Sequence, residues 1–197
     1  MGRKMQEEML TLEKFEEASE IVKKVTLETK LVYSDYFSAQ TGNRVYLKPE
    51  NLQFTGAYKL RGAYYKMSTL TDEERAKGLI TASAGNHAQG VALAASVLNC
   101  HATIFMPRST PEVKQTEVRR HGGRHVKIML HGDCYDETAA AAHEYAETHG
   151  STFVHPYDDL VTMAGQGTLA DEVVMSGEGP FDRAYVAIGG GGLATGV

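Results

Sequence analysis

The chain has 197 residues, of which 42% are hydrophobic, 8% aromatic and 23% charged, and its 20 basic and 25 acidic side chains give a net charge of −5. This composition excludes a disordered chain, a collagen-like chain and a disulfide scaffold, and an acidic balance speaks against a nucleic-acid binder. With no apolar run of about 18 residues and no apolar signal core at the N-terminus, we expect a cytoplasmic protein of about one and a third domains, without a membrane partner.

The first predicted elements are two helices and a short strand. Apolar residues recur on one helical face and predict a helix over 11–25. A short strand over 44–47 is stopped by Pro49, and a helix follows over 57–70. Thr71 and the acidic residues after it are typical of the N-cap and first turn of another helix.

From residue 79 onward, predicted strands alternate with predicted helices. Strands are expected over 79–82, 102–106, 126–130, 153–155 and 184–188, and helices over 86–98, from 110–111 to 122–123, 135–149 and 159–175. The second of these helices is expected to have Pro111 as its first helical residue. This alternation predicts an α/β fold in which a mostly parallel sheet is covered by helices on both faces. Because ligands of such sheets bind at the carboxyl ends of strands, the loops after strands are the places to seek chemistry.

The first candidate loop, residues 51–63, contains Lys59 near the start of a predicted helix. A helix N-terminus disfavours a nearby cation, and enclosure favours the neutral form of an amine. Such a lysine suits a Schiff base with a carbonyl compound. By itself the loop is not specific, because most lysines are solvated surface residues.

The second candidate loop, residues 83–90, follows a predicted strand and opens a helix that is apolar nearly all round. Its backbone N–H groups, with the side chains of Ser83 and Asn86, could hold a carboxylate or a phosphate. Ordinary helix capping by Ser or Asn is the alternative explanation. His87 alone is more often a capping or core residue than a catalyst.

The third candidate loop consists of four glycines, residues 189–192, after an apolar strand. Glycine leaves the backbone free to wrap closely around an anion. A flexible linker is the alternative, but the preceding strand and the apolar Leu193 weigh against it. The loop matches neither the P-loop nor GxGxxG, and the scattered histidines and absence of CxxC or HExxH predict no metal site.

Taken together and in order, these loops resemble those of a known family. Residues 48–53, 55–63, 83–90 and 189–193 resemble the pyridoxal-phosphate-dependent threonine dehydratases, or threonine ammonia-lyases, of the tryptophan-synthase-β-like fold group. The resemblance covers residues 13–197. It implies two open, mostly parallel three-layer αβα domains (fold type II), pyridoxal 5′-phosphate as cofactor, a small amino-acid substrate and a homo-oligomer, either dimer or tetramer.

The resemblance also implies a role for each loop. Lys59 would carry the cofactor and act on the substrate, with the ring of Tyr58 against the cofactor ring and Asn86 bonded to its 3′-oxygen. The substrate-binding residues would be Ser83, Ala84, Gly85, Asn86 and His87. The phosphate would be bound by Gly189, Gly190, Gly191, Gly192 and Leu193.

The reaction implied is the dehydration and deamination of L-threonine to 2-oxobutanoate and ammonia, with L-serine giving pyruvate. Two residues depart from related patterns: Ala57 replaces the common serine of the lysine motif, and Ala84 replaces a serine found in serine racemases. We therefore expect elimination without efficient racemisation. The alternatives are another fold type II enzyme (β-replacement or racemase), an inactive anion-binding fragment, and a nucleotide-binding domain that uses Gly190, Gly192 and Gly196.

The resemblance predicts how the chain divides into domains. Residues 1–44 would be a helical segment of the larger domain, 45–155 the smaller αβα domain with the cofactor lysine, and 156–197 the start of the larger domain. Members of the family continue well beyond the glycine loop. We therefore expect the larger domain to be incomplete here and the isolated chain to be weakly active or inactive.

Overall fold

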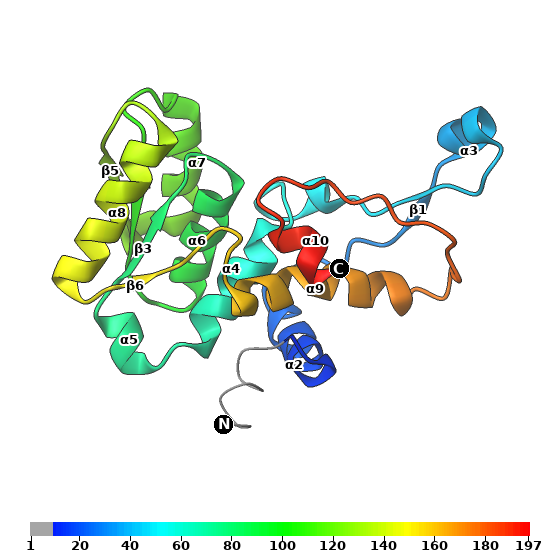
Figure 1. Ribbon diagram of the computed structural model, residues 1–197, viewed down its shortest axis with the longest axis horizontal. Helices are drawn as coiled ribbons and strands as arrows, with labels where there is room; N and C mark the ends of the chain where they lie inside the picture. The colour runs from blue at the N-terminus through cyan, green and yellow to red at the C-terminus, as the bar shows by residue number, and fades with distance from the viewer. Residues whose placement is uncertain (1–9) are drawn as a thin grey trace.

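A four-stranded parallel sheet is the frame of the structure, which is a computed structural model describing residues 10–197 (Figure 1). The strands lie in the order β5 (Val126–Leu130), β4 (Ala102–Met106), β3 (Leu79–Ala82) and β6 (Thr152–Phe153), and each adjacent pair is parallel. The parallel sheet confirms the predicted α/β class. The expectation about an N-terminal signal segment falls mostly on residues outside the described range.

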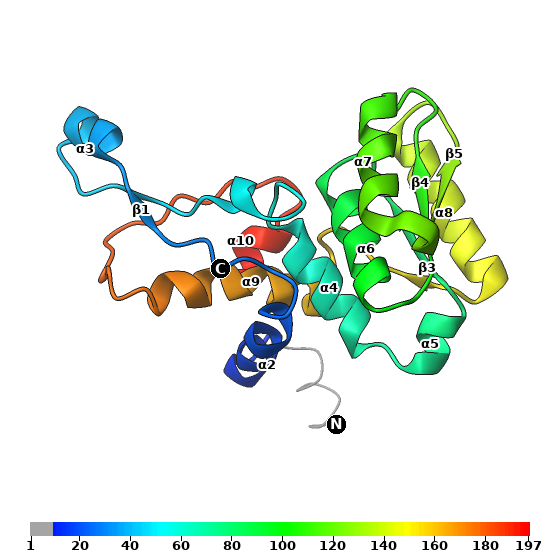
Figure 2. The same ribbon diagram turned by 180° about the vertical axis from the view of Figure 1, so that it is seen from behind.

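Helices cover both faces of this sheet (Figures 1 and 2). Helix α8 (Tyr135–His149) lies on one face, and α6 (Asn86–Val97) and α7 (Glu112–Gly122) lie on the other. Successive strand residues point to opposite faces, so Ile80 packs in the core under α8 whereas Leu79 packs in the core with α6. The short elements beside these are α5 (Asp72–Ala76) and η2 (Gly123–His125).

Helix α4 (Lys59–Thr69) joins this sheet unit to the rest of the chain. It packs against α6 on one side and against α9 (Leu160–Val174) on the other, and α2 (Leu12–Val22) lies across α4 and α9. The contact between α4 and α9 is very close, because a Cβ atom at Gly165 would lie 2.7 Å from Cα of Gly62. Only glycine permits two helix backbones to approach in this way.

The remaining elements extend away from the sheet unit (Figure 1). A two-stranded antiparallel sheet of β1 (Val32–Tyr33) and β2 (Tyr46–Leu47) carries α3 (Asp35–Thr41) at its outer end. The chain then returns through η1 (Glu50–Leu52) to α4. The last element, α10 (Gly192–Gly196), packs on α9.

Most predicted elements are present, with two clear corrections. Residues 184–188 form no strand, since they pair with no strand among residues 10–197. The side chains of Tyr185 and Ile188 in this segment are 90% and 74% exposed. Pro111 is the N-cap residue of α7 and not its first helical residue. The predicted strands 79–82, 102–106 and 126–130 match β3, β4 and β5 residue for residue.

Two findings about the whole described part of the chain bear on function. Within residues 10–197, no helix is long and apolar enough to cross a lipid bilayer. The same residues contain no group of three His, Cys, Asp or Glu side chains placed to hold a metal ion.

Candidate active site

The segment 154–157, directly after β6, brings the candidate loops together. The main-chain oxygen of Val154 accepts a hydrogen bond from Oγ1 of Thr81 at 2.9 Å and lies 3.0 Å from Nε2 of His87. The main-chain oxygen of Pro156 accepts a hydrogen bond from Nζ of Lys59 at 2.6 Å. Because β3 and β6 are parallel neighbours, the loops that follow them leave the sheet at the same edge.

Lys59 is the first residue of α4 and is partly buried. Its Nζ lies 5.4 Å from the centre of the Tyr58 ring, in addition to its bond to Pro156. Burial lowers the pKa of Lys59, because desolvation penalises the charged ammonium. A larger fraction of the amine is therefore neutral at a given pH, which is the form that attacks a carbonyl carbon.

The loop after β3 presents main-chain donors at the start of α6. The N–H of Gly85 donates to Oγ of Ser83 at 3.2 Å, and Asn86 begins the helix at an exposed position. No side chain caps α6. The N–H groups of its first turn are therefore available to an anionic ligand, as the sequence predicted for a carboxylate site.

The His87 side chain points into the structure and is only 3% exposed. Its Nε2 donates to the Val154 carbonyl, whereas Nδ1 is buried without a hydrogen-bond partner. Burial is the main reason that the pKa of His87 falls to about 4; its bond to Val154 opposes the shift, and the nearby Lys59 and His155 reinforce it. The neutral ring fixes the loop to the end of β6, leaving the main-chain N–H of His87 for a ligand.

Replacing His87 with asparagine is expected to remove part of the acid sensitivity of the fold. The pKa of His87 in the folded chain, about 4, lies below its usual value of 6.5, so above pH 6.5 this residue does not reduce the free energy of unfolding. It falls as the pH drops toward 4, by up to about 3 kcal/mol, because only the unfolded chain binds the proton. Urea unfolding at pH 7, 5.5 and 4.5 measures this. The control variant His101→Asn, at an exposed site, should keep the wild-type dependence of the free energy of unfolding on pH. The same dependence on pH in His87→Asn as in the wild type would contradict the expectation.

The glycine loop lies against the same segment 154–157. A Cβ atom at Gly190 would lie 2.5 Å from the ring of Tyr157, and one at Gly192 would lie 2.7 Å from its main-chain oxygen. The outer side of the loop is open, since a Cβ at Gly189 or Gly191 would meet nothing within 4 Å. The loop therefore packs closely on Tyr157 with an open side toward a ligand, and Leu193 follows it in the first turn of α10.

Sequence reasoning did not single out the segment 154–157. It carries neither a glycine-rich pattern nor a lysine, and its residues contribute mainly through main-chain oxygens, which sequence motifs do not reveal. The rule that ligands bind after parallel strands could have identified it, because it follows directly on β6. In the structure it links Lys59, the loop after β3 and the glycine loop.

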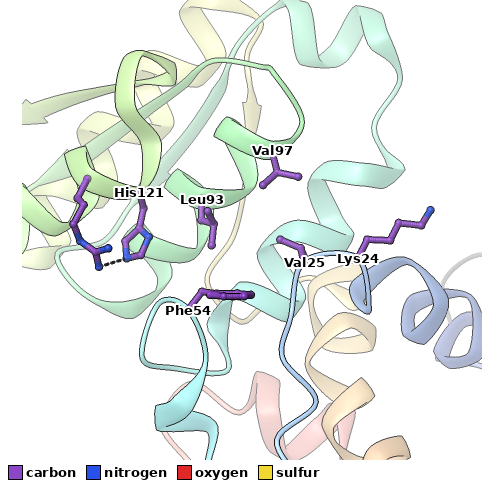
Figure 3. Close-up of a pocket in the computed structure, with 7 residues that line it drawn as sticks. Lys24, Val25, Phe54, Leu93, Val97 and His121 are labelled. Atoms are coloured by element: carbon purple, nitrogen blue, oxygen red, sulfur yellow. Dashed lines mark hydrogen bonds between the residues drawn. The ribbon is translucent and has the colours of Figure 1, made fainter.

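Two surface hollows lie away from this group. One hollow, which Figure 3 shows, has a volume of about 340 Å³. In it, Nη2 of Arg120 lies 3.0 Å from Nε2 of His121. Its lining residues are Lys24, Val25, Phe54, Leu93, Val97, Arg120 and His121. A second, of about 380 Å³, lies beside the end of α9 next to Phe181. Neither is lined by Lys59 or the glycine loop, so both lie apart from the group around segment 154–157.

Comparison with known proteins agrees with the predicted family and fold. Residues 22–197 match the family described as pyridoxal-phosphate dependent enzymes. The chain is 45% identical over 192 residues to the biosynthetic L-threonine dehydratase of Lactococcus lactis, covering 96% of this chain and 46% of that protein. It is 47% identical over 189 residues to the L-threonine ammonia-lyase of Thermotoga maritima, again covering 96% and 46%.

The fold of this chain is also similar to solved structures of named enzymes. The processed form of threonine deaminase isoform 2 from Solanum lycopersicum superposes with a TM-score of 0.83 at 38% identity, covering 95% of this chain and 52% of that one. Maize serine racemase superposes with a TM-score of 0.87 at 32% identity, covering 94% and 55%. The chain spans about half the length of the curated relatives that it matches.

Proposed function

The chain belongs to the family of pyridoxal-phosphate dependent enzymes, and from this premise we propose that the protein is a lyase acting on L-threonine. It would form 2-oxobutanoate and ammonia, and it would convert L-serine to pyruvate as a side reaction. The observation that carries the proposal is the partly buried Lys59, which bonds to the Pro156 carbonyl where the loop after β3 and the glycine loop meet. The names of the similar proteins support threonine as the substrate.

The residues around segment 154–157 fit pyridoxal phosphate. The aldehyde of the cofactor reacts with a neutral amine, which the lowered pKa of Lys59 favours. The aromatic ring of Tyr58, next to the Lys59 amine, could pack against the cofactor ring. A phosphate requires room close to main-chain N–H groups, and residues 189–192 leave such room because a Cβ at Gly189 or Gly191 would meet nothing within 4 Å. We assign the cofactor to these residues together with Asn86 and Leu193.

When bound, the cofactor supplies an electron sink for the α-carbon of the amino acid. With substrate and cofactor bound, Nζ of Lys59 would be the base that accepts the α-proton. Burial favours this role, because it lowers the pKa of Lys59 and so increases the neutral fraction. The main-chain N–H groups in the first turn of α6 would hold the substrate carboxylate, with residues 83–87 orienting the α-carbon toward Lys59.

A decisive experiment is to identify the lysine that takes up the cofactor. The chain is incubated with pyridoxal phosphate, reduced with borohydride and digested, and the modified peptide is identified by mass spectrometry. We expect saturable modification at Lys59, with Lys48 and Lys66 unmodified because both are held by carboxylates. Modification spread over surface lysines, without saturation at Lys59, would refute the proposal. Formation of 2-oxobutanoate from L-threonine then tests the substrate.

Ala84 is expected to separate elimination from racemisation. Its methyl group can neither give nor take a proton, so a proton can return to the α-carbon only from Lys59. With L-serine as substrate we expect pyruvate and no rapid accumulation of D-serine. Ala84→Ser should raise D-serine formation at least about tenfold, because it adds a side chain able to transfer a proton. Chiral chromatography of the products measures this, and fast racemisation by the unmodified protein would contradict the reading.

The remaining parts of the proposal rest on the family resemblance. We propose the domain division given above, with 45–155 as the smaller domain, 156–197 as the beginning of the larger one and 1–44 as its helical segment. We also propose a homo-oligomer, dimer or tetramer, located in the cytoplasm and used in isoleucine biosynthesis or threonine catabolism. Light scattering of the purified protein tests the oligomeric state.

A further inference from the structure

Arg61 follows Lys59 by two residues in α4, and its side chain is fully buried. Its Nε and Nη2 donate to the two oxygens of Glu50 at 2.8 and 2.9 Å. Its Nη1 and Nη2 also donate to the two oxygens of Glu172 at 2.7 and 3.0 Å, and Nη1 donates to Oγ1 of Thr168 at 3.1 Å. A guanidinium has five N–H donors, so these bonds satisfy all of them.

The two carboxylates that hold Arg61 are themselves held by other segments. Glu50 accepts a further bond from Oγ1 of Thr29 at 2.5 Å, and Glu172 accepts one from Nζ of Lys48. Two cations and two anions therefore form a neutral buried cluster, which we call the Arg61 cluster (Lys48, Glu50, Arg61 and Glu172). Burying such charges is favourable only when geometry and hydrogen bonding are nearly complete, as they are here.

Within the Arg61 cluster, Arg61 and Glu50 each favour the charged form of the other. Burial by itself would raise the pKa of Glu50, but the hydrogen bonds and positive charge of Arg61, with the bond from Thr29, outweigh burial and lower it. For Arg61, burial would lower the pKa, and the bonds to Glu50 and Glu172 outweigh it in the same way. Arg61 therefore joins Glu50 on one side to Glu172 of α9 on the other by ionic hydrogen bonds.

The position of Lys59 depends on how α4 sits against α9. Lys59 begins α4, whereas its hydrogen-bond partner Pro156 lies three residues before Asp159, the N-cap of α9. Two ionic contacts join these helices: the Arg61 cluster at the Lys59 end of α4, and the pair of Lys66 and Asp159 at 2.7 Å farther along it. Of these two ionic contacts, the one made by Arg61 is therefore the nearer in the chain to the turn that carries Lys59.

We infer that Arg61 is a positioning residue for Lys59. By fixing the first turn of α4 to α9, the guanidinium holds the Lys59 amine at the Pro156 carbonyl in its partly buried place. The inference rests on the proposed function, because it concerns the lysine assigned there to the cofactor. Nothing in the cluster contacts that amine directly, so Arg61 acts on the reaction only through the placement of α4.

The test measures the reactivity of Lys59 without cofactor. The chain is labelled with acetic anhydride over a pH series, and mass spectrometry gives the pH midpoint of labelling at Lys59. For the unmodified chain we expect a midpoint below that of exposed lysines. Arg61→Lys keeps the charge but loses the planar fork, so it should shift the midpoint upward by about half a unit or more, toward the ordinary lysine value of about 10.4.

Two further variants make the result interpretable. Glu172→Gln weakens the same contact from the α9 side and should shift the midpoint in the same direction, so it decides the question if Arg61→Lys does not fold. Arg120→Lys changes an exposed arginine–glutamate pair on α7, which contacts neither Lys59 nor segment 154–157, and should leave the midpoint unchanged. Unchanged midpoints in folded Arg61→Lys or Glu172→Gln would overturn the inference. Failure of pyridoxal phosphate to modify Lys59 would instead refute the proposed function while leaving the labelling shift intact.

Discussion

Replacing Lys59 with alanine is expected to abolish covalent uptake of pyridoxal phosphate and, with it, all turnover of L-threonine that the unmodified chain shows. The proposed function gives the residue two roles, since its amine would take up the cofactor and then act as the base for the α-proton. Both require an amine at the Pro156 carbonyl, where Nζ of Lys59 lies 2.6 Å from the oxygen. Absorbance spectra with added cofactor and a 2-oxobutanoate assay measure the two effects.

The control for this prediction separates chemistry from folding. Burial lowers the pKa of Lys59 in the folded chain below its value in the unfolded chain. The buried amine therefore costs no stability at a pH above the unfolded pKa, and it reduces the free energy of unfolding as the pH falls below that pKa. Lys59→Ala removes this unfavourable contribution and is expected to unfold at no lower urea concentration than wild type at pH 7. Lys66→Ala, in the same helix, should retain cofactor uptake. Retained turnover in Lys59→Ala would exclude the assigned role.

Replacing Gly165 with valine is expected to destabilise the fold by about 3 kcal/mol, at the upper end for an overpacked core. A Cβ there would lie 2.7 Å from Cα of Gly62 and 2.9 Å from the main-chain oxygen of Arg61. Both atoms belong to the backbone of α4, which cannot move aside as a flexible side chain can. The helices would have to separate, breaking the bond between the Gly62 N–H and Oε1 of Gln166.

Urea unfolding of the chain without cofactor measures this loss of stability. Gly189→Ala is the matched control, because a Cβ at that position meets no atom within 4 Å and should change the unfolding midpoint little. A Gly165→Val midpoint equal to that of wild type would mean that α4 and α9 do not pack through their glycines.

The sequence predicted those elements whose signals are local. The strand Leu79–Ala82 is a short apolar run, and Thr71 with Glu74 forms the capping box that its spacing indicates. The pairing of β1 with β2 was not predicted, because two residues per strand are too few to show the alternation of apolar and polar residues that indicates a strand. Residues 184–188 have the composition of a strand, but a strand also requires a neighbour, and none pairs with them among residues 10–197.

The candidate site was predictable to the extent that it depends on loops after strands. Lys59 and the loop that begins at Ser83 were identified because a helix start and a strand end mark them in the sequence. Arg61 was not, because nothing local distinguishes a buried arginine from an exposed one. Its partner Glu172 lies 111 positions away, and only the folded chain brings the two together.

This separation along the chain has a consequence for biosynthesis. Glu50 precedes Arg61 by 11 positions, whereas Glu172 follows it by 111. As the chain leaves the ribosome from its N-terminus, Arg61 meets its first carboxylate early and its second only after α9 has been translated. We therefore expect the helix that carries Lys59 to take its final place late, so that the Lys59 amine stays mobile in the nascent chain until α9 has emerged.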